Sequence, residues 1–158
     1  MSTQVASEPL VESLSKEDEN KALVRQAVQE FVNEGNTDVA EELWAADYCW
    51  HPGDGVSGVM GREDHIRDYR EFRTALPDLH LEIDDMLADG DKVVTRFTMT
   101  GTHTGPLRKA RTDTIIPPTG TKLKWTGMVI HRIENGKIVE GHVQYDYAGI
   151  ARQIGETL

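Results

Sequence analysis

Cysteine is almost absent from this chain of 158 residues, and Cys49 is its single example. One cysteine cannot form a disulfide within the chain, so the sequence fits a reducing compartment, and we expect a cytoplasmic protein. A lone thiol acts as a nucleophile only beside a base, and the sequence does not place a base next to Cys49. The sequence also has no apolar run long enough to span a membrane and no apolar signal segment near its beginning.

Basic residues are in the minority, with 17 Lys and Arg against 27 Asp and Glu and a formal net charge of -10. Nucleic acids and anionic membranes bind basic surfaces, so we expect neither as a partner. The apolar fraction of 38% is typical of a globular domain. We expect one domain over residues 15–158, preceded by a polar, disordered tail over residues 1–14.

Helical periodicity dominates the first half of the chain. Ser15 is a candidate N-cap, and apolar pairs then recur every four residues as far as Gly35. Thr37 is placed to cap a short second helix, and residues 62–76 predict a third, which Pro77 ends.

Alternating apolar residues replace this period after Pro77, which predicts strands around turns at residues 89–91 and at Asn135-Gly136. Asn-Gly is a strong hairpin signal because both positions of the turn need positive φ. Helices followed by an antiparallel meander predict an α+β fold, with the N-terminal helices packed on one face of a curved, mostly antiparallel sheet.

The Asn135-Gly136 turn also predicts a register, in which Glu134 pairs with Lys137. Counting outward from that pair places His142, Gln144 and Asp146 on one face, opposite Val129, Gly127 and Trp125 respectively. Gly127 would then leave space in front of Gln144. The opposite face has apolar residues as well, so alternation alone does not decide which face lies inside.

Asp146 is the candidate general acid/base on that face. In an apolar cavity its carboxylate would lose hydration, which raises its pKa toward neutrality. Trp125 would offer a stacking surface, and His142 and Gln144 would hydrogen-bond a carbonyl or its enolate. The alternative is that Asp146 caps a short helix that follows it.

Histidines supply further candidates. His103 lies between Gly101 and Gly105, and His51 follows Trp50 at the start of a glycine-rich loop. The alternatives are a polar loop residue for His103 and a turn residue for His51. We expect His65 and His80 to be solvated and His131 to be structural. No histidine shows a diagnostic ligand spacing, so we expect no metal and no cofactor.

Several short segments together form a recognisable pattern: Phe31-Val32, Asn36, residues 43–51, residues 72–79, Gly101-Thr102-His103-Thr104-Gly105, Pro117-Pro118-Thr119-Gly120, Trp125-Thr126-Gly127, residues 133–140, Asp146 and Gln153-Ile154-Gly155. In these segments the chain resembles the SnoaL-like polyketide cyclases, or ester cyclases, of the nuclear-transport-factor-two-like superfamily. The resemblance implies a cone-shaped α+β barrel that encloses a pocket, and homodimers or homotetramers built through the sheet.

The resemblance also implies a reaction, the cofactor-free aldol closure of a polyketide ester, in which Asp146 shuttles protons and His51 and His103 help to bind or polarise the substrate. Trp50, Trp125, Gly127, His142 and Gln144 would then belong to the surface that binds a small hydrophobic substrate. Two features depart from the family pattern. His142 stands where the family has Trp, and residues 108–114 form an insertion, either a lid over the pocket or a plain surface loop.

Three functions follow from this sequence. The first is a cyclase of natural-product biosynthesis. The second is another acid/base reaction in the same pocket, by an isomerase, hydratase or epoxide hydrolase, because one fold supports many reactions. The third is a ligand-binding domain without catalysis.

Overall fold

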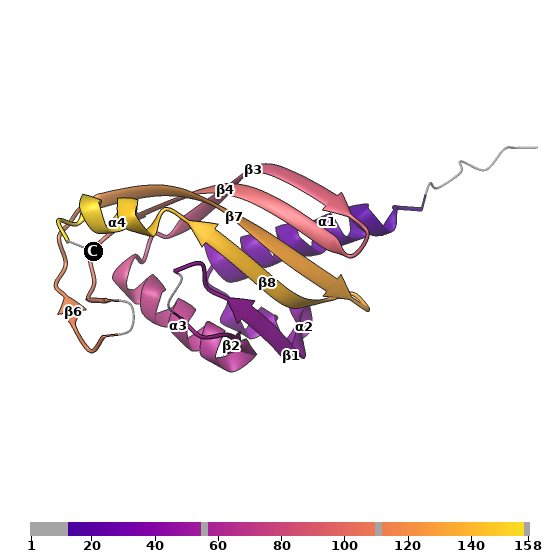
Figure 1. Ribbon diagram of the computed structural model, residues 1–158, viewed down its shortest axis with the longest axis horizontal. Coiled ribbons are helices and arrows are strands. Elements are labelled where there is room, and N and C mark those ends of the chain that lie inside the picture. The colour runs from indigo at the N-terminus through magenta and orange to yellow at the C-terminus, as the bar shows by residue number, and fades with distance from the viewer. Residues whose placement is uncertain (1–12, 55–56, 110–111, 157–158) are drawn as a thin grey trace, which may run out of the picture.

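The computed structural model describes residues 13–54, 57–109 and 112–156 (Figure 1). Most of the expected N-terminal tail, residues 1–12, lies outside the described residues. Among the helices of the described part, none is long and apolar enough to cross a membrane.

The elements follow one another along the chain as α1 Lys16–Gln26, the π-helix η1 Ala27–Asn33, the 3-10 helix η2 Thr37–Val39, α2 Ala40–Leu43, β1 Trp44–His51, β2 Met60–Gly61, α3 Arg62–Ala75, β3 His80–Asp89, β4 Lys92–Thr102, β5 Leu107–Arg108, β6 Ile115–Ile116, β7 Lys122–Glu134, β8 Lys137–Tyr145 and α4 Tyr147–Gln153. This order confirms the expected α+β fold, with helices first and an antiparallel meander after them.

The main sheet has six strands in the order β2-β1-β8-β7-β4-β3 (Figure 1). All of its pairs are antiparallel except β1 with β8, which run parallel. The sheet curves but does not close into a barrel. Helix α1 packs against β3 and β4, and α3 packs against β1, so helices complete the cone that the sheet leaves open.

The first helix begins where the sequence predicts. Ser15 adopts an extended backbone, and its hydroxyl accepts a hydrogen bond of 3.1 Å from the Asp18 backbone N–H. That bond satisfies one of the N–H groups that an N-terminal turn leaves without a partner. The helix continues into η1 and thereby delivers Phe31 to the core.

Strand β1 was not among the predicted strands, because residues 43–51 were expected to end a helix and enter a loop. The second helix instead ends at Leu43, and the chain runs extended from Trp44 to His51. Trp44, Tyr48 and Trp50 are spaced at even intervals, so all three point to the same face of the strand. That face is the inner one, where Trp44 and Tyr48 are buried.

The β7–β8 hairpin confirms its turn but not the register that the turn predicts. Asn135 and Gly136 both have positive φ, 51° and 72°, and Glu134 pairs with Lys137. Ile133 then pairs with Ile138 but Arg132 pairs with Glu140, so Val139 has no partner across the hairpin. This β-bulge shifts β8 by one residue, and a shift by one residue exchanges the two faces of a strand.

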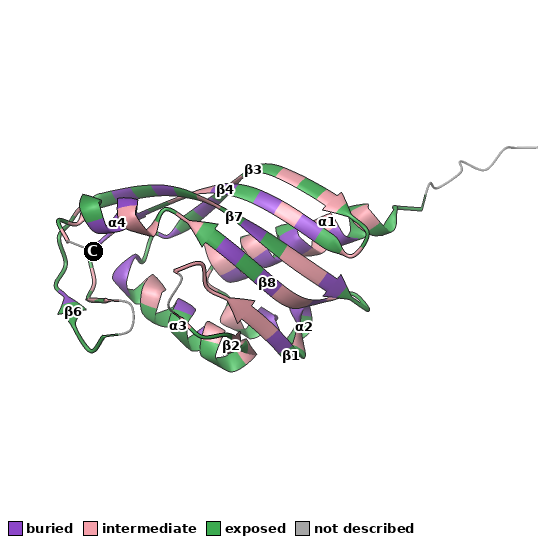
Figure 2. Ribbon diagram, viewed as in Figure 1, coloured by how far each residue is buried: buried purple, intermediate pink, exposed green. Residues whose placement is uncertain are grey.

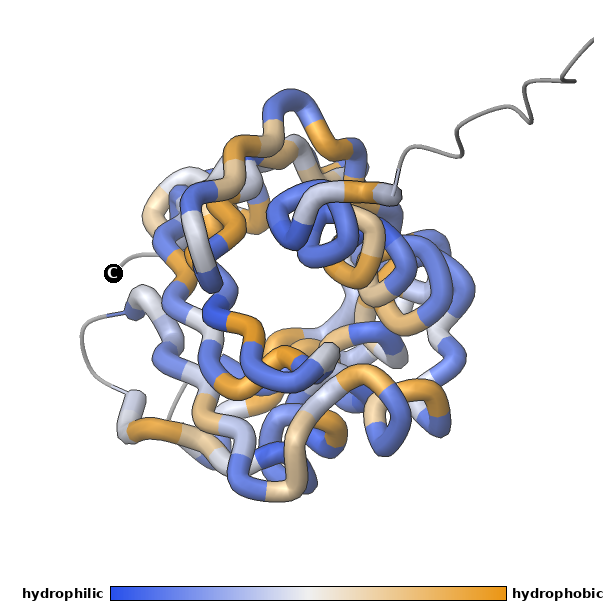
Figure 3. Tube along the Cα trace, turned by 90° about the vertical axis from the view of Figure 1, so that its right-hand side faces the viewer, coloured by the Kyte–Doolittle hydropathy of each residue, from blue (hydrophilic) through white to orange (hydrophobic). Residues whose placement is uncertain are grey.

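The core lies between the concave face of the sheet and the helices (Figure 2). Along β7 and β8 buried and exposed residues alternate, so the outer face carries exposed Met128, Ile130 and His142 while Val129 and Val143 face inward. Viewed end-on, sheet and helices surround a central region (Figure 3).

Candidate active site

A cavity of about 420 Å³ fills the interior of the cone. Its walls are mostly apolar and aromatic and come from α1, η1, β1, α3, β4, β7, β8 and α4. Trp50 and Trp125, both predicted to contact substrate, line it. A partly open, mostly apolar space of this size suits a small organic molecule.

Buried polar atoms without a hydrogen-bond partner among the described residues gather on the cavity wall: Trp44 Nε1, Tyr48 Oη, His65 Nδ1, Thr95 Oγ1 and His131 Nδ1. We call these the floor atoms. Buried polar atoms in proteins are nearly always paired, so such a group calls for a functional explanation. The residues that carry these atoms line the cavity, but the atoms themselves are covered, so a ligand oxygen would bond to them only after small movements of the neighbouring side chains.

His65 enters the floor from α3 and is held there by aromatic rings. Its imidazole stacks on Trp50 at a centroid distance of 4.3 Å, and Trp44 and Tyr48 lie 5.2 and 5.7 Å away. The loss of hydration on burial and the nearby His131 together lower the pKa of His65 to about 3. The expectation that His65 is solvated was therefore wrong, and its ring is neutral at pH 7.

His131 lies on the inner face of β7, where its strand pairs with β4. Burial lowers the pKa of His131 to about 4, so this ring is neutral as well. We expected a structural residue here, and the structure instead places His131 in the cavity wall. Thr95, only 1% exposed, joins the floor from β4. The floor is thus polar but uncharged.

Carboxylates also line the cavity. Asp68 of α3 lines it, and loss of hydration around its carboxylate, with the negative charges of Glu71 and Asp54 nearby, raises the pKa of Asp68. Asp54 also lines the cavity and accepts hydrogen bonds from the backbone N–H and the hydroxyl of Ser57. A carboxylate with a raised pKa is a better proton carrier near neutrality.

The inserted loop contributes to the cavity wall, because Arg108 and Lys109 line the cavity. Both side chains face acidic partners of the same chain. Arg108 Nε lies 3.1 Å from Glu71 Oε2, and Lys109 Nζ lies 3.7 Å from Glu156 Oε2. A lid function for this loop stays a prediction, and residues 110–111 lie outside the described residues.

The predicted face of β8 was wrong in register. His142 pairs with Ile130 and Gln144 with Met128, and both side chains are exposed on the outer face. Gly127 pairs with Tyr145, and a Cβ there would lie 2.6 Å from Phe97 Cζ. The missing side chain therefore makes room for Phe97 and Tyr145, not for a ligand before Gln144. The cause of the wrong register is the bulge at Val139, which shifts the pairing of β8 with β7 by one residue.

Asp146 lies past the end of β8 at the N-cap of α4. Its carboxylate accepts a 2.8 Å hydrogen bond from the Gly149 N–H, and its side chain is 54% exposed. It does not line the cavity. The structure thus agrees with the alternative placement, a helix cap, and corrects the expected placement inside the cavity. A part for Asp146 in the reaction stays a prediction.

Replacement of Asp146 by Ala should remove the α4 cap and lower the free energy of unfolding by about 1 kcal/mol. Asp146→Asn is the matched control, because an asparagine side chain caps equally well and only the charge is lost. Urea unfolding of both variants measures the difference. Equal stability of Asp146→Ala and the unchanged chain would mean that the cap contributes nothing.

His103 is fully buried where β4 ends, but outside the cavity lining. Its Nδ1 lies 2.9 Å from the Thr119 hydroxyl, and its backbone N–H donates to Thr121 O. Burial lowers the pKa of His103, and a backbone contact with Gly105 offsets part of that effect. The ring therefore joins two loops, and a catalytic role for it stays a prediction.

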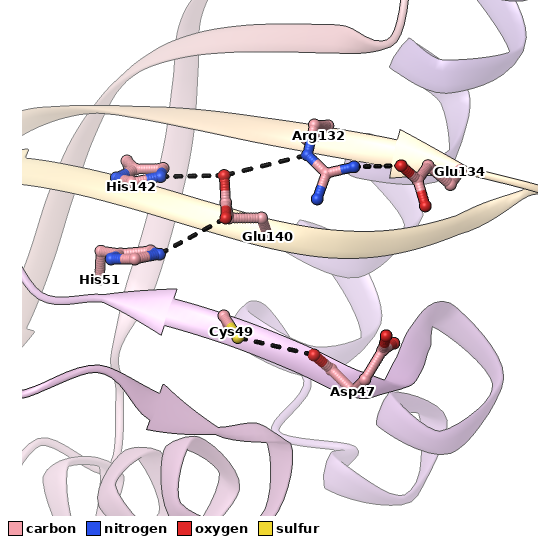
Figure 4. Close-up of polar contacts among 7 residues, drawn as sticks. All are labelled: Asp47, Cys49, His51, Arg132, Glu134, Glu140 and His142. Carbon is pink, nitrogen blue, oxygen red and sulfur yellow. Dashed lines mark hydrogen bonds and ion pairs between the residues drawn. The ribbon is translucent and has the colours of Figure 1, made fainter.

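His51 ends β1 and lies on the outer face, also outside the cavity lining. Its ring stacks on His142 with centroids 3.9 Å apart, and both rings point toward Glu140 (Figure 4). A hydrogen bond from His142, the charge of Arg132 and the nearby His51 lower the pKa of Glu140. The catalytic role expected for His51 stays a prediction as well.

The sequence profile of the SnoaL-like polyketide cyclases matches residues 22–154, which is most of the chain. The chain belongs to the SnoaL-like polyketide cyclase family. A comparison with curated proteins found no match.

Solved structures of similar proteins agree with this family. AclR from Streptomyces galilaeus, a candidate hydroxylase, is 25% identical with a TM-score of 0.76, over 90% of this chain and 88% of that one. IdmH from Streptomyces antibioticus, a candidate polyketide cyclase, is 25% identical with a TM-score of 0.72, over 86% and 98%. TsrD from Streptomyces laurentii is 26% identical with a TM-score of 0.74, over 92% and 100%.

Proposed function

We propose that this family member is a cofactor-independent acid/base enzyme for a small, largely apolar carbonyl compound, and that its reaction is the intramolecular aldol closure of a polyketide ester. The observation that carries the proposal is the cavity, whose walls are apolar and whose floor atoms are polar but uncharged. Such a site favours a flat molecule with a neutral oxygen at its buried end. The family and the similarity to IdmH support the choice of reaction.

The floor atoms would bind the carbonyl that becomes an enolate. Trp44 Nε1 can only donate, and the neutral rings of His65 and His131 each carry one N–H. Donors fixed in a dry site stabilise a developing oxyanion more than donors in water do. The enolate carbon then attacks a second carbonyl carbon of the same molecule, which forms the new carbon–carbon bond and leaves an alkoxide.

Proton transfer falls to a carboxylate, and Asp68 is our candidate. It would remove the proton next to the bound carbonyl and return it to the alkoxide after ring closure. Its raised pKa and its position in the cavity wall support this role. The resemblance assigns the same role to Asp146, whose carboxylate would first have to leave the Gly149 N–H.

Incubation with an aromatic polyketide methyl ester in heavy water tests both steps. Mass-resolved chromatography follows ring closure, and deuterium uptake next to the carbonyl reports enolate formation even where closure fails. We expect Asp68→Asn to slow both by about 100-fold, as general acid–base catalysis contributes on that scale. Asp64→Asn is the control, since Asp64 lies one helical turn away and pairs with Arg67.

If Asp146→Asn loses both ring closure and deuterium uptake while Asp68→Asn keeps full activity, then Asp146 is the proton-transfer residue and the role of Asp68 is refuted. Ligand binding with neither ring closure nor deuterium uptake would refute the enzyme itself and leave a binding domain. Deuterium uptake without closure would favour a second candidate, another reaction that begins at the same enolate.

A further inference from the structure

The outer face of the sheet carries a second group of chemically active side chains, on the side opposite the cavity. His51 ends β1, and Glu140 and His142 lie two residues apart on β8 (Figure 4). His51 and His142 are direct neighbours in the parallel β1–β8 pair, and residues two apart on a strand share a face. The backbone therefore brings all three side chains together.

Their ligand atoms converge. His142 Nε2 lies 3.1 Å and His51 Nε2 lies 3.6 Å from the two oxygens of Glu140, and all three ligand atoms lie within 4.8 Å of one another. The contact of His51 is too long for a hydrogen bond. Its Nε2 is buried and has no hydrogen-bond partner in the described part of the chain. A buried ring nitrogen aimed at a carboxylate without bonding to it is a ligand atom available to an ion.

We propose that His51, Glu140 and His142 bind a divalent ion of the zinc type, such as Zn²⁺ or Co²⁺. Two imidazoles and one carboxylate are a ligand set that zinc sites use, with a further position left for water. Imidazole ligands favour such borderline ions over Mg²⁺ and Ca²⁺, which take oxygen ligands. The site does not overlap the cavity and is independent of the proposed reaction.

Small rotations of the side chains would complete the coordination. The two rings now stack with planes 7° apart, and a shared ion about 2.0–2.1 Å from each nitrogen requires them to tilt toward each other. Both side chains are free to do so at the surface, since His142 is 51% and His51 is 32% exposed.

The surrounding charge favours a cation. Arg132 Nε lies 3.9 Å from Glu140, but the guanidinium also pairs with Glu134, so the neighbourhood keeps a net negative charge (Figure 4). The excess of acidic residues in the whole chain acts in the same direction.

An ion bound by His51 of β1 and by Glu140 and His142 of β8 would link the two strands. Pairing between these strands is irregular between Trp44 and Cys49, and regular pairing resumes only from Cys49 to His51. Gly141, between two of the ligands, lies against Trp50 on the cavity side, where a Cβ would come within 2.7 Å of its ring. A bound ion would therefore hold the strand that carries Trp50 and raise the stability of the fold.

Titration of the metal-free, tag-free chain with Zn²⁺ against a chelating indicator tests the proposal. We expect one ion per chain and a higher melting temperature with zinc. His51→Gln and His142→Gln should each weaken binding by more than about 100-fold, because even loss of a residue that supports a ligand weakens metal binding about 10- to 100-fold. Glu140→Gln should do the same, and Mg²⁺ should not compete.

The control is His80→Gln, because His80 lies 3.7 Å from Glu82 in an exposed pair for which the described residues supply no third ligand. It should bind zinc as the unchanged chain does. So should Cys49→Ser, although Cys49 is the cross-strand neighbour of Glu140. The proposal is overturned by absence of zinc binding, by unchanged affinity when both His51 and His142 are replaced, or by loss of affinity in Cys49→Ser or His80→Gln.

Discussion

Acidification from about pH 6.5 to about pH 4.5 should destabilise the folded chain by roughly 2 to 3 kcal/mol for each of two buried histidines. Burial lowers the pKa of His65 to about 3 and that of His131 to about 4 in the folded chain, from the usual histidine value of about 6.5. In this window the unfolded chain binds protons that the folded chain does not, so stability is full above pH 6.5 and falls as the pH falls. Urea unfolding at a series of pH values measures the slope.

The loss of stability that the two histidines cause between about pH 6.5 and about pH 4.5 can be separated from the loss that protonation of carboxylates causes. Carboxylates whose folded-state pKa values are lowered, such as Glu140 and Asp78, lose their contribution mainly below that window. His131→Gln should flatten the slope by about half, whereas His80→Gln, which alters an exposed ring, should keep it. A chain whose stability is the same at pH 6.5 and pH 4.5 would show that the two rings are not buried as described.

Tyr48→Phe should stabilise the fold by about 1 kcal/mol and slow the proposed reaction about 100-fold. Tyr48 is 1% exposed and stacks on Trp44, but its hydroxyl is one of the floor atoms without a hydrogen-bond partner in the described part of the chain. Removal of a buried hydroxyl without a partner relieves its desolvation, whereas the substrate loses a donor. Urea unfolding and the ring-closure assay measure the two effects.

Tyr69→Phe supplies a control of opposite sign. Tyr69 also lines the cavity, but its hydroxyl donates to the Val32 backbone carbonyl, so its removal should destabilise the fold by about 1 kcal/mol. Equal loss of stability in Tyr48→Phe and Tyr69→Phe would mean that the Tyr48 hydroxyl has a partner in the folded chain. Full activity of Tyr48→Phe would remove it from the substrate site.

Local signals in the sequence predicted much of the fold. The Ser15 cap, the helix before Pro77 and the Asn135-Gly136 turn all depend on residues close together in the chain, and all three are confirmed. Strand β1 was missed because a short helix and then a glycine-rich loop were expected in this region, and the even spacing of Trp44, Tyr48 and Trp50 was not used as a strand signal. That spacing was the signal for both the strand and the floor.

The candidate site was harder to predict, because burial and register are set by contacts between distant segments. The neutral character of His65 comes from aromatic rings on β1, and no pattern in α3 itself predicts it. The bulge at Val139 has no sequence signature comparable to Asn-Gly, so the count outward from the turn failed after two pairs. His142 and Gln144 were displaced from the cavity for that reason, whereas Asp146 lies past the end of β8 and caps α4.

Because the bulge at Val139 sets the register of β8, a change of one residue in length there would change which side chains of β8 face the cavity. A one-codon deletion at this position would restore even pairing with β7 and present the even-numbered residues of β8, among them His142 and Gln144, to the interior. The residues that now line the cavity from this strand, Val143 and Tyr145, would move to the outside in the same step. Insertions and deletions in this hairpin can thus replace a whole row of lining side chains at once, a route to new substrates that point substitutions do not offer.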